Sequence, residues 1–75
     1  MESKTYTSSN GETMSIDTME TTHLTNAMAK KMREVFNAST KEQAYETINI
    51  VNDLKEEAFK RINTFIETLG EDNGE

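Results

Sequence analysis

The densest group of side chains that could bind a ligand is basic. Lys30, Lys31 and Arg33 fall within one turn of an expected helix, in a chain whose formal net charge is −6. Ammonium and guanidinium groups form charge-assisted hydrogen bonds with phosphate, so the cluster is a candidate site for a small anion. A second interpretation stays open, in which the cluster is a solvated helix face and Lys30 pairs with Glu34 four residues on.

Two rings that precede this cluster could stack on a nucleotide base. His23 lies on the same expected helix as the cluster, although an isolated His is more often a surface or capping residue than a ligand. Tyr6 stands in an otherwise polar segment, where a solvated Tyr in a frayed tail is the alternative interpretation. Both rings are therefore candidates for stacking, and neither belongs to a recognisable motif.

The acidic residues do not form a catalytic pair. Adjacent helix residues point about 100° apart, so Glu56 and Glu57 do not converge on one substrate, and Glu71 and Asp72 lie in an expected tail. The chain has no Cys, one His, no Gly-rich phosphate loop and no His-Glu-x-x-His motif. We therefore predict a protein that is not an enzyme and that has no catalytic residue, no metal site and no cofactor.

The elements that would position the basic and aromatic groups are two helices. Apolar residues recur at helical spacing in two stretches, which predicts an all-α fold with a short helix at about 18–37 and a long helix at about 40–69. Ser39 and Glu42 have the spacing of a capping box, which predicts the start of the long helix. Gly70 is placed to end that helix in the left-handed conformation.

The short break between the helices predicts an antiparallel helical hairpin. The short helix begins at residues 17–18 or, alternatively, at 21–22. At 1.5 Å per residue the short helix spans about 30 Å and the long helix about 45 Å. The long helix therefore leaves its last apolar side chains without cover: Phe59, Ile62, Phe65, Ile66 and Leu69. Because so small a chain without disulfides or metal is usually stabilised by oligomerisation, we predict a homo-oligomer with these side chains at its interface.

The ends of the chain are polar. We expect residues 1–15 to be a mobile arm, residues 16–70 to be the helical hairpin domain and residues 71–75 to be an acidic tail. No apolar run is long enough to span a membrane and the N-terminus has no hydrophobic signal region, so we expect a cytosolic protein without a membrane partner. The negative net charge argues against binding to a DNA or RNA duplex.

Over about residues 24–66 the sequence resembles the small phage anti-CBASS type 2 proteins. The shared features are a short first helix, a tight break, a Thr40-Lys41-Glu42 segment like that family's Ser-Arg-Glu, and Glu56-Glu57-Ala58 with Asn63 and Ile66 at the family's spacing. Where the family favours Trp-Ala before that Asn, this chain has Arg61-Ile62. The resemblance implies a compact hexamer that sequesters cyclic di- or trinucleotides in pockets between subunits without cleaving them.

With this resemblance, our leading hypothesis is a phage immune-evasion protein that blocks CBASS signalling in the host cytoplasm. The candidate phosphate partners are Lys30, Lys31, Arg33 and Lys41, and the candidate stacking partners are Tyr6, His23 and Tyr45. The alternative is a small acidic helical protein that binds and inhibits a host protein. A third possibility is a purely structural helical oligomer.

Overall fold

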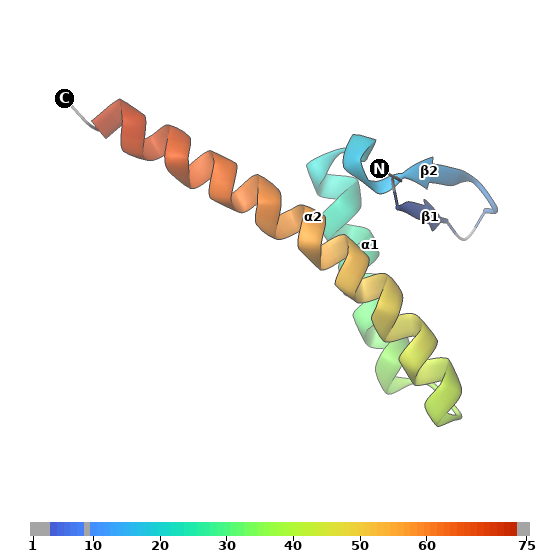
Figure 1. Cartoon of the computed structure of the whole chain (residues 1–75). Helices are drawn as coiled ribbons and strands as arrows, with labels where there is room; N and C mark the ends of the chain where they lie inside the picture. Colours follow the sequence, from blue (N-terminus) through green and yellow to red (C-terminus); the bar gives the residue numbers. More distant parts are fainter. Residues whose placement is uncertain (1–3, 9, 74–75) are drawn as a thin grey trace.

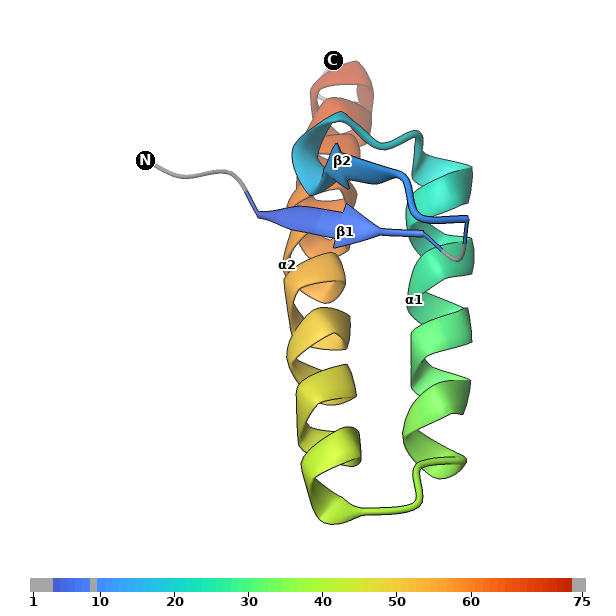
Figure 2. The same ribbon diagram turned by 90° about the vertical axis from the view of Figure 1, so that its right-hand side faces the viewer.

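The computed structural model describes residues 4–8 and 10–73, which are mostly helical (Figure 1). Along the chain the elements are β1 (Thr5–Thr7), β2 (Thr13–Ser15), a 3-10 helix η1 (Ile16–Thr18), α1 (Thr21–Phe36) and α2 (Lys41–Asn73). Helices α1 and α2 lie side by side and antiparallel, as the short break predicts (Figure 2). The predicted helical hairpin is confirmed, and the small two-stranded sheet corrects the all-α prediction.

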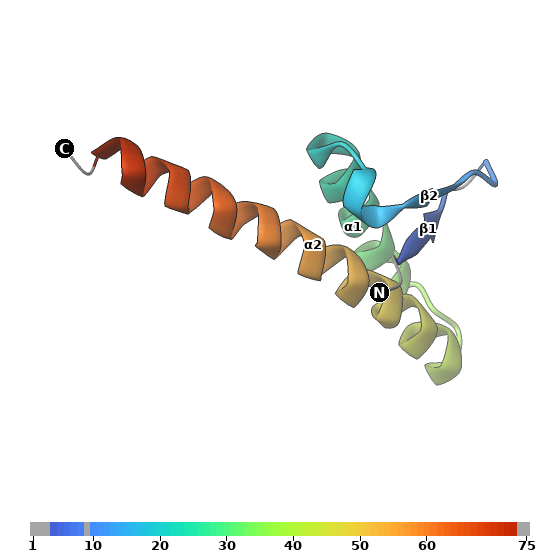
Figure 3. The same ribbon diagram turned by 45° about the horizontal axis from the view of Figure 1, so that its top comes forward.

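The two helices differ strongly in length. Helix α1 begins at Thr21, which agrees with the later of its two predicted starts, and Glu20 precedes it without a side-chain capping bond. Helix α2 has 33 residues against 16 in α1, so it continues well beyond α1 (Figures 1 and 3). We name residues 59–73 of α2 the overhang.

Gly70 does not end α2, contrary to the prediction. The helix continues to Asn73, and among the described residues only Gly11 has a positive φ. A glycine inside a helix costs about 1 kcal/mol relative to alanine, which a helix of this length tolerates. Residues 71–73 of the predicted tail are therefore helical, while residues 74–75 lie outside the described residues.

The start of α2 is capped one residue later than predicted. The Oγ1 atom of Thr40 accepts a hydrogen bond from the Gln43 amide at 3.1 Å, and Gln43 Oε1 accepts one from the Ser39 amide at 2.9 Å. Thr40 is therefore the N-cap, and the side chain of Gln43 rather than Glu42 reaches back, to the amide of the residue before the cap. Ser39 with Glu42 and Thr40 with Gln43 both have capping-box spacing, so spacing alone could not separate them.

The segment predicted as a mobile arm contains a β-hairpin. Strand β1 pairs antiparallel with β2, and Tyr6 lies opposite Met14. The turn between them includes Gly11 at a φ of 90°, a conformation that glycine adopts without steric cost. Tyr6 is 5% exposed and Met14 packs against the core, so burial of this cross-strand pair outweighs the polar composition of the segment. Residues 1–3 and 9 lie outside the described residues.

Lys4 ties the β-hairpin to α2. Its Nζ atom lies 3.1 Å from Asp53 Oδ1 and 3.3 Å from Glu56 Oε1. Hydrogen bonds to Asp53 and then to Glu56 raise the pKa of Lys4 above its ordinary value of 10.5. Because the Lys4 side chain is 54% exposed, added salt weakens this contact.

The core lies between the two helices and the N-terminal segment. Leu24 of α1 and Leu54 of α2 are fully buried at its centre. Five further side chains complete the buried cluster: Tyr6, Ile16, Met19, Ala27 and Ala58. Three of them precede α1, so the β-hairpin and η1 cover a face that the two helices alone would leave exposed to water.

Candidate functional site

Tyr6, His23 and Lys31 meet where the β-hairpin packs on α1. The ring centroids of Tyr6 and His23 are 6.4 Å apart with an interplanar angle of 88°, and Lys31 Nζ lies 5.8 Å from the Tyr6 centroid. His23 and Lys31 are about two helical turns apart on α1, so the Tyr6 ring lies along one ridge of that helix. Because Tyr6 is buried in the core, its ring is not available to stack on a ligand, contrary to the prediction.

Intramolecular contacts engage part of the basic cluster. Lys31 Nζ lies 3.1 Å from Glu34 Oε1, so Lys31 pairs with an acidic residue three positions on. Lys30 is half-buried and also interacts within the chain. Arg33 is exposed. Of the three clustered cations, Arg33 is therefore the one whose exposure best suits a phosphate ligand.

A second group of predicted ligand residues lies at the opposite end of α1, where residues 37–40 lead into α2. Arg33 is in the last turn of α1, while Lys41 and Tyr45 are in the first two turns of α2, and all three are exposed. Phe36 is 87% exposed and joins this group. Its place as the last residue of α1 was the signal that could have identified it. We call this region the connection end.

The predicted ligand residues do not form one site within a single chain. Helix α1 advances about 20 Å from His23 to Phe36 at 1.5 Å per residue. The β-hairpin packs near the start of α1 and the connection end lies at its other end (Figure 2). The set therefore divides into one group near the β-hairpin, consisting of Tyr6, His23 and Lys31, and another at the connection end, consisting of Arg33, Lys41 and Tyr45. Lys30 lies between the two groups along α1.

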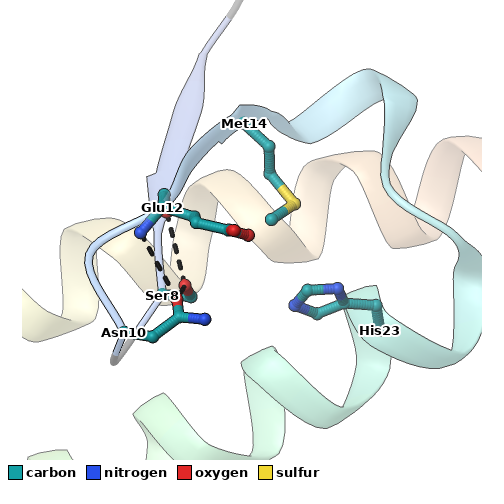
Figure 4. Close-up of a pocket in the computed structure, with 5 residues that line it drawn as sticks. All are labelled: Ser8, Asn10, Glu12, Met14 and His23. Carbon is teal, nitrogen blue, oxygen red and sulfur yellow. Dashed lines mark hydrogen bonds between the residues drawn. The ribbon is translucent and has the colours of Figure 1, made fainter.

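An open hollow of about 430 Å³ separates the β-hairpin turn from α1 (Figure 4). It is lined by Ser8, Asn10, Glu12, Met14 and His23. Asn10 Oδ1 accepts hydrogen bonds from the Ser8 hydroxyl and the Glu12 amide. These groups therefore stabilise the turn with hydrogen bonds to one another. The Glu12 carboxylate reaches toward the same space as His23 (Figure 4), and its negative charge disfavours a phosphate there.

Arg61 has a structural role that the sequence analysis missed. Its Nε donates to Glu57 Oε2 at 2.8 Å, and its Nη1 donates to Thr21 Oγ1 at 3.1 Å. Its Nη2 donates to the carbonyl oxygens of Ile16 and Asp17 at 3.4 and 3.3 Å. The planar guanidinium therefore holds the corner between η1 and α1 against α2, a geometry that Lys cannot reproduce. Only the spacing of Glu57 and Arg61 was visible in the sequence.

The overhang exposes the apolar side chains that were predicted to form an interface. Their exposed fractions range from 44% at Leu69 to 61% at Phe65, and the set is Phe59, Ile62, Phe65, Ile66 and Leu69. A mostly apolar groove of about 330 Å³ adjoins them where α1 begins. Ile62 and Phe65 line this groove together with Leu24 and Thr25 of α1. Large exposed apolar patches often mark interaction surfaces, so the overhang is a candidate for one.

The described part of the chain contains neither a cluster of metal ligands nor a membrane-spanning helix. Within residues 4–8 and 10–73, no three His, Cys, Asp or Glu side chains gather as metal ligands. Over the same residues, neither helix has an apolar stretch long enough to cross a membrane. Comparisons with protein-family models, curated proteins and solved structures find no match to this chain.

Proposed function

We propose that this chain is a non-enzymatic protein that self-associates through the overhang and sequesters cyclic oligonucleotides. The observation that carries the proposal is the apolar surface of the overhang, where five large side chains are each at least 44% exposed. Soluble monomers rarely expose a continuous apolar surface of this kind, and a second copy offers the same surface in return. The resemblance to anti-CBASS type 2 proteins over about residues 24–66 suggests cyclic oligonucleotides as the ligands and a hexamer as the assembly.

The connection end offers the chemistry that such a ligand requires. Phosphates bind guanidinium and ammonium groups, and bases stack on aromatic faces. Arg33 and Lys41 are the exposed cations there, while Phe36 and Tyr45 are the rings. Because Tyr45 is 65% exposed and Phe36 more so, either ring can pack on a base without local unfolding. Pockets between subunits would combine these groups from neighbouring copies.

The other predicted ligand residues contribute less in this proposal. Tyr6 stabilises the core, and Lys31 contacts both Tyr6 and Glu34. His23 stays a candidate for stacking because it is exposed on α1. No step of the proposed activity breaks a bond in the ligand, so no catalytic residue is assigned.

Calorimetric titration of the full chain with cyclic GMP-AMP and with cyclic triadenylate tests the ligand class. We expect binding of at least one ligand at micromolar protein, weakened roughly tenfold or more by Lys41→Glu, because a hydrogen bond to a charged group contributes about 1.5–3 kcal/mol. The matched control is Lys60→Glu, which makes the same charge change at an exposed position of the overhang. Absence of heat with both ligands would contradict the proposal.

The alternative function is inhibition of a host protein by a small acidic helical protein. The net charge of −6 and the apolar overhang favour it, because a basic partner with an apolar groove would be complementary to both. This alternative predicts no heat with either nucleotide and a stoichiometric complex with one basic host protein. A purely structural oligomer would show neither property.

A further inference from the structure

We infer that two copies pair through their overhangs in antiparallel orientation, with a two-fold axis near Thr64; this inference rests on the self-association in the proposed function. Four of the exposed apolar residues of the overhang follow one line along α2: Phe59, Ile62, Ile66 and Leu69. Alternating steps of three and four residues keep them on one face of the helix. We name these four residues the seam.

The spacing of the seam reads the same in both directions. Successive members are three, four and three residues apart. A reversed second copy therefore places its Leu69 against Phe59 and its Ile66 against Ile62, and Thr64 lies midway between the two ends. Every contact between the two helices along the seam is then apolar on both sides, which removes both exposed surfaces from water at once.

Polar residues fix the register of this pairing. Asn52 and Lys55 come one heptad before Phe59 and Ile62 and are exposed on the same face of α2. Sliding one helix by a heptad would bring Asn52 and Lys55 against apolar side chains, and burial of an unpartnered polar or charged group costs several kcal/mol. The antiparallel register centred on Thr64 keeps both residues outside the apolar layers.

Charge distinguishes the antiparallel pair from a parallel one. In a parallel pair the seam also matches itself, but Lys55 then faces Lys55 of the second copy. In the antiparallel pair Lys55 stands beside the last turn of the second copy's α2, which ends at Asn73. The C-terminal end of a helix carries partial negative charge, which attracts the Lys55 ammonium group. Attraction therefore replaces repulsion at both ends of the seam.

The groove beside the seam is completed by the same arrangement. It lies at the first turns of α1, and Ile62 belongs both to the groove and to the seam. Helix α1 runs antiparallel to α2 and begins level with Arg61, as the contact with Thr21 shows. With residue 59 facing residue 69 of the second copy, the last turns of the second overhang lie level with the first turn of α1 and beside this groove. The groove is incomplete without that second copy.

Disulfide cross-linking tests the orientation, because the chain contains no Cys of its own. Phe59→Cys and Leu69→Cys chains are prepared separately, mixed in equal amounts and oxidised with glutathione disulfide. The two variants differ in mass, so intact mass spectrometry separates the three possible cross-linked pairs. We expect the mixed pair to exceed either like pair at least tenfold, since residue 59 faces residue 69 of the second copy.

A mixture of Lys60→Cys with Thr68→Cys is the control, because both residues are exposed outside the seam and should cross-link little. A predominance of like pairs would overturn the antiparallel orientation while leaving self-association intact. A wild-type chain that remains monomeric would overturn the self-association as well, and with it the inference. A mixed pair no more abundant than random pairing would also contradict the inference.

Discussion

Tyr6 and His23 meet edge to face, with ring centroids 6.4 Å apart, and this contact joins the β-hairpin to α1. Each strand of the β-hairpin has only three residues, so its own backbone ladder cannot keep it folded. The contacts that Tyr6 makes in the core supply the missing stability. The β-hairpin is therefore part of the fold and determines which rings and cations remain accessible.

Replacement of Tyr6 by alanine should lower the free energy of unfolding by about 3 kcal/mol, because truncation of a large core side chain leaves a cavity. The matched control is Tyr45→Ala, which removes a ring that is 65% exposed and should change stability by no more than about 0.5 kcal/mol. Urea unfolding monitored by circular dichroism measures both. Equal effects of the two substitutions would show that Tyr6 is not a core residue.

Lys4→Gln should loosen the contact of the β-hairpin with α2 at neutral pH, because it removes the ion pairs with Asp53 and Glu56. The pKa of Lys4 is raised in the folded chain, so its stabilising effect is complete below pH 10.5 and is lost as pH rises through the higher folded-state value. Hydrogen–deuterium exchange at pH 7 should therefore be faster over residues 4–15 in the variant and unchanged over α1.

Two further comparisons check the role of Lys4. The melting temperatures of wild type and Lys4→Gln should differ by a constant amount between pH 6 and 9 and converge above pH 10.5. Lys60→Gln removes an exposed cation from the overhang and should not affect exchange in the β-hairpin. Unchanged exchange over residues 4–15 in Lys4→Gln would show that the ion pairs do not hold the β-hairpin.

Thr40→Ala should destabilise the chain by about 1 kcal/mol, because it removes the side-chain oxygen that accepts a hydrogen bond from the Gln43 amide. Ser39→Ala is the control and should cost only a few tenths of a kcal/mol, since Ser39 contributes its backbone amide, which alanine retains. Thermal unfolding of both variants shows which residue is the N-cap. A larger loss of stability with Ser39→Ala than with Thr40→Ala would mean that Ser39 is the N-cap, as the sequence predicted.

Phe65→Asp should dissociate the assembly, because an unpaired charge buried between copies costs several kcal/mol. Thr68→Asp introduces the same charge at an exposed position of the overhang outside the seam, and it should leave the mass of the assembly unchanged. Analytical ultracentrifugation compares the two variants with wild type. Retention of the wild-type mass by Phe65→Asp would place the interface elsewhere.

The helical hairpin and the overhang were predictable because their signals are local. Leu24 and Leu54 belong to the apolar residues that recur at helical spacing in the two stretches, and both are fully buried. The difference in helix length followed from the same pattern, and it left Phe65 exposed beyond α1. Spacing could not choose between Ser39 and Thr40 as the cap, since both have a suitable partner three residues on.

The β-hairpin and the accessibility of the candidate ligand residues were not predictable from spacing. Strand pairing depends on the contact between Tyr6 and Met14, and two runs of three residues are too short to show a strand period. The bonds of Arg61 to the carbonyl oxygens of Ile16 and Asp17 join residues more than 40 positions apart and leave no sequence signature. The burial of Tyr6 likewise depends on its packing with residues distant in sequence, such as Leu54 and Ala58.

Native mass spectrometry of the full chain at micromolar concentration, with and without cyclic GMP-AMP or cyclic triadenylate, tests the central claim most directly. Self-association through the overhang predicts a mass of two or more times 8.5 kDa. The mass should increase further by that of the bound nucleotide when ligand is present. A mass of 8.5 kDa at every concentration, with or without nucleotide, would contradict the claim.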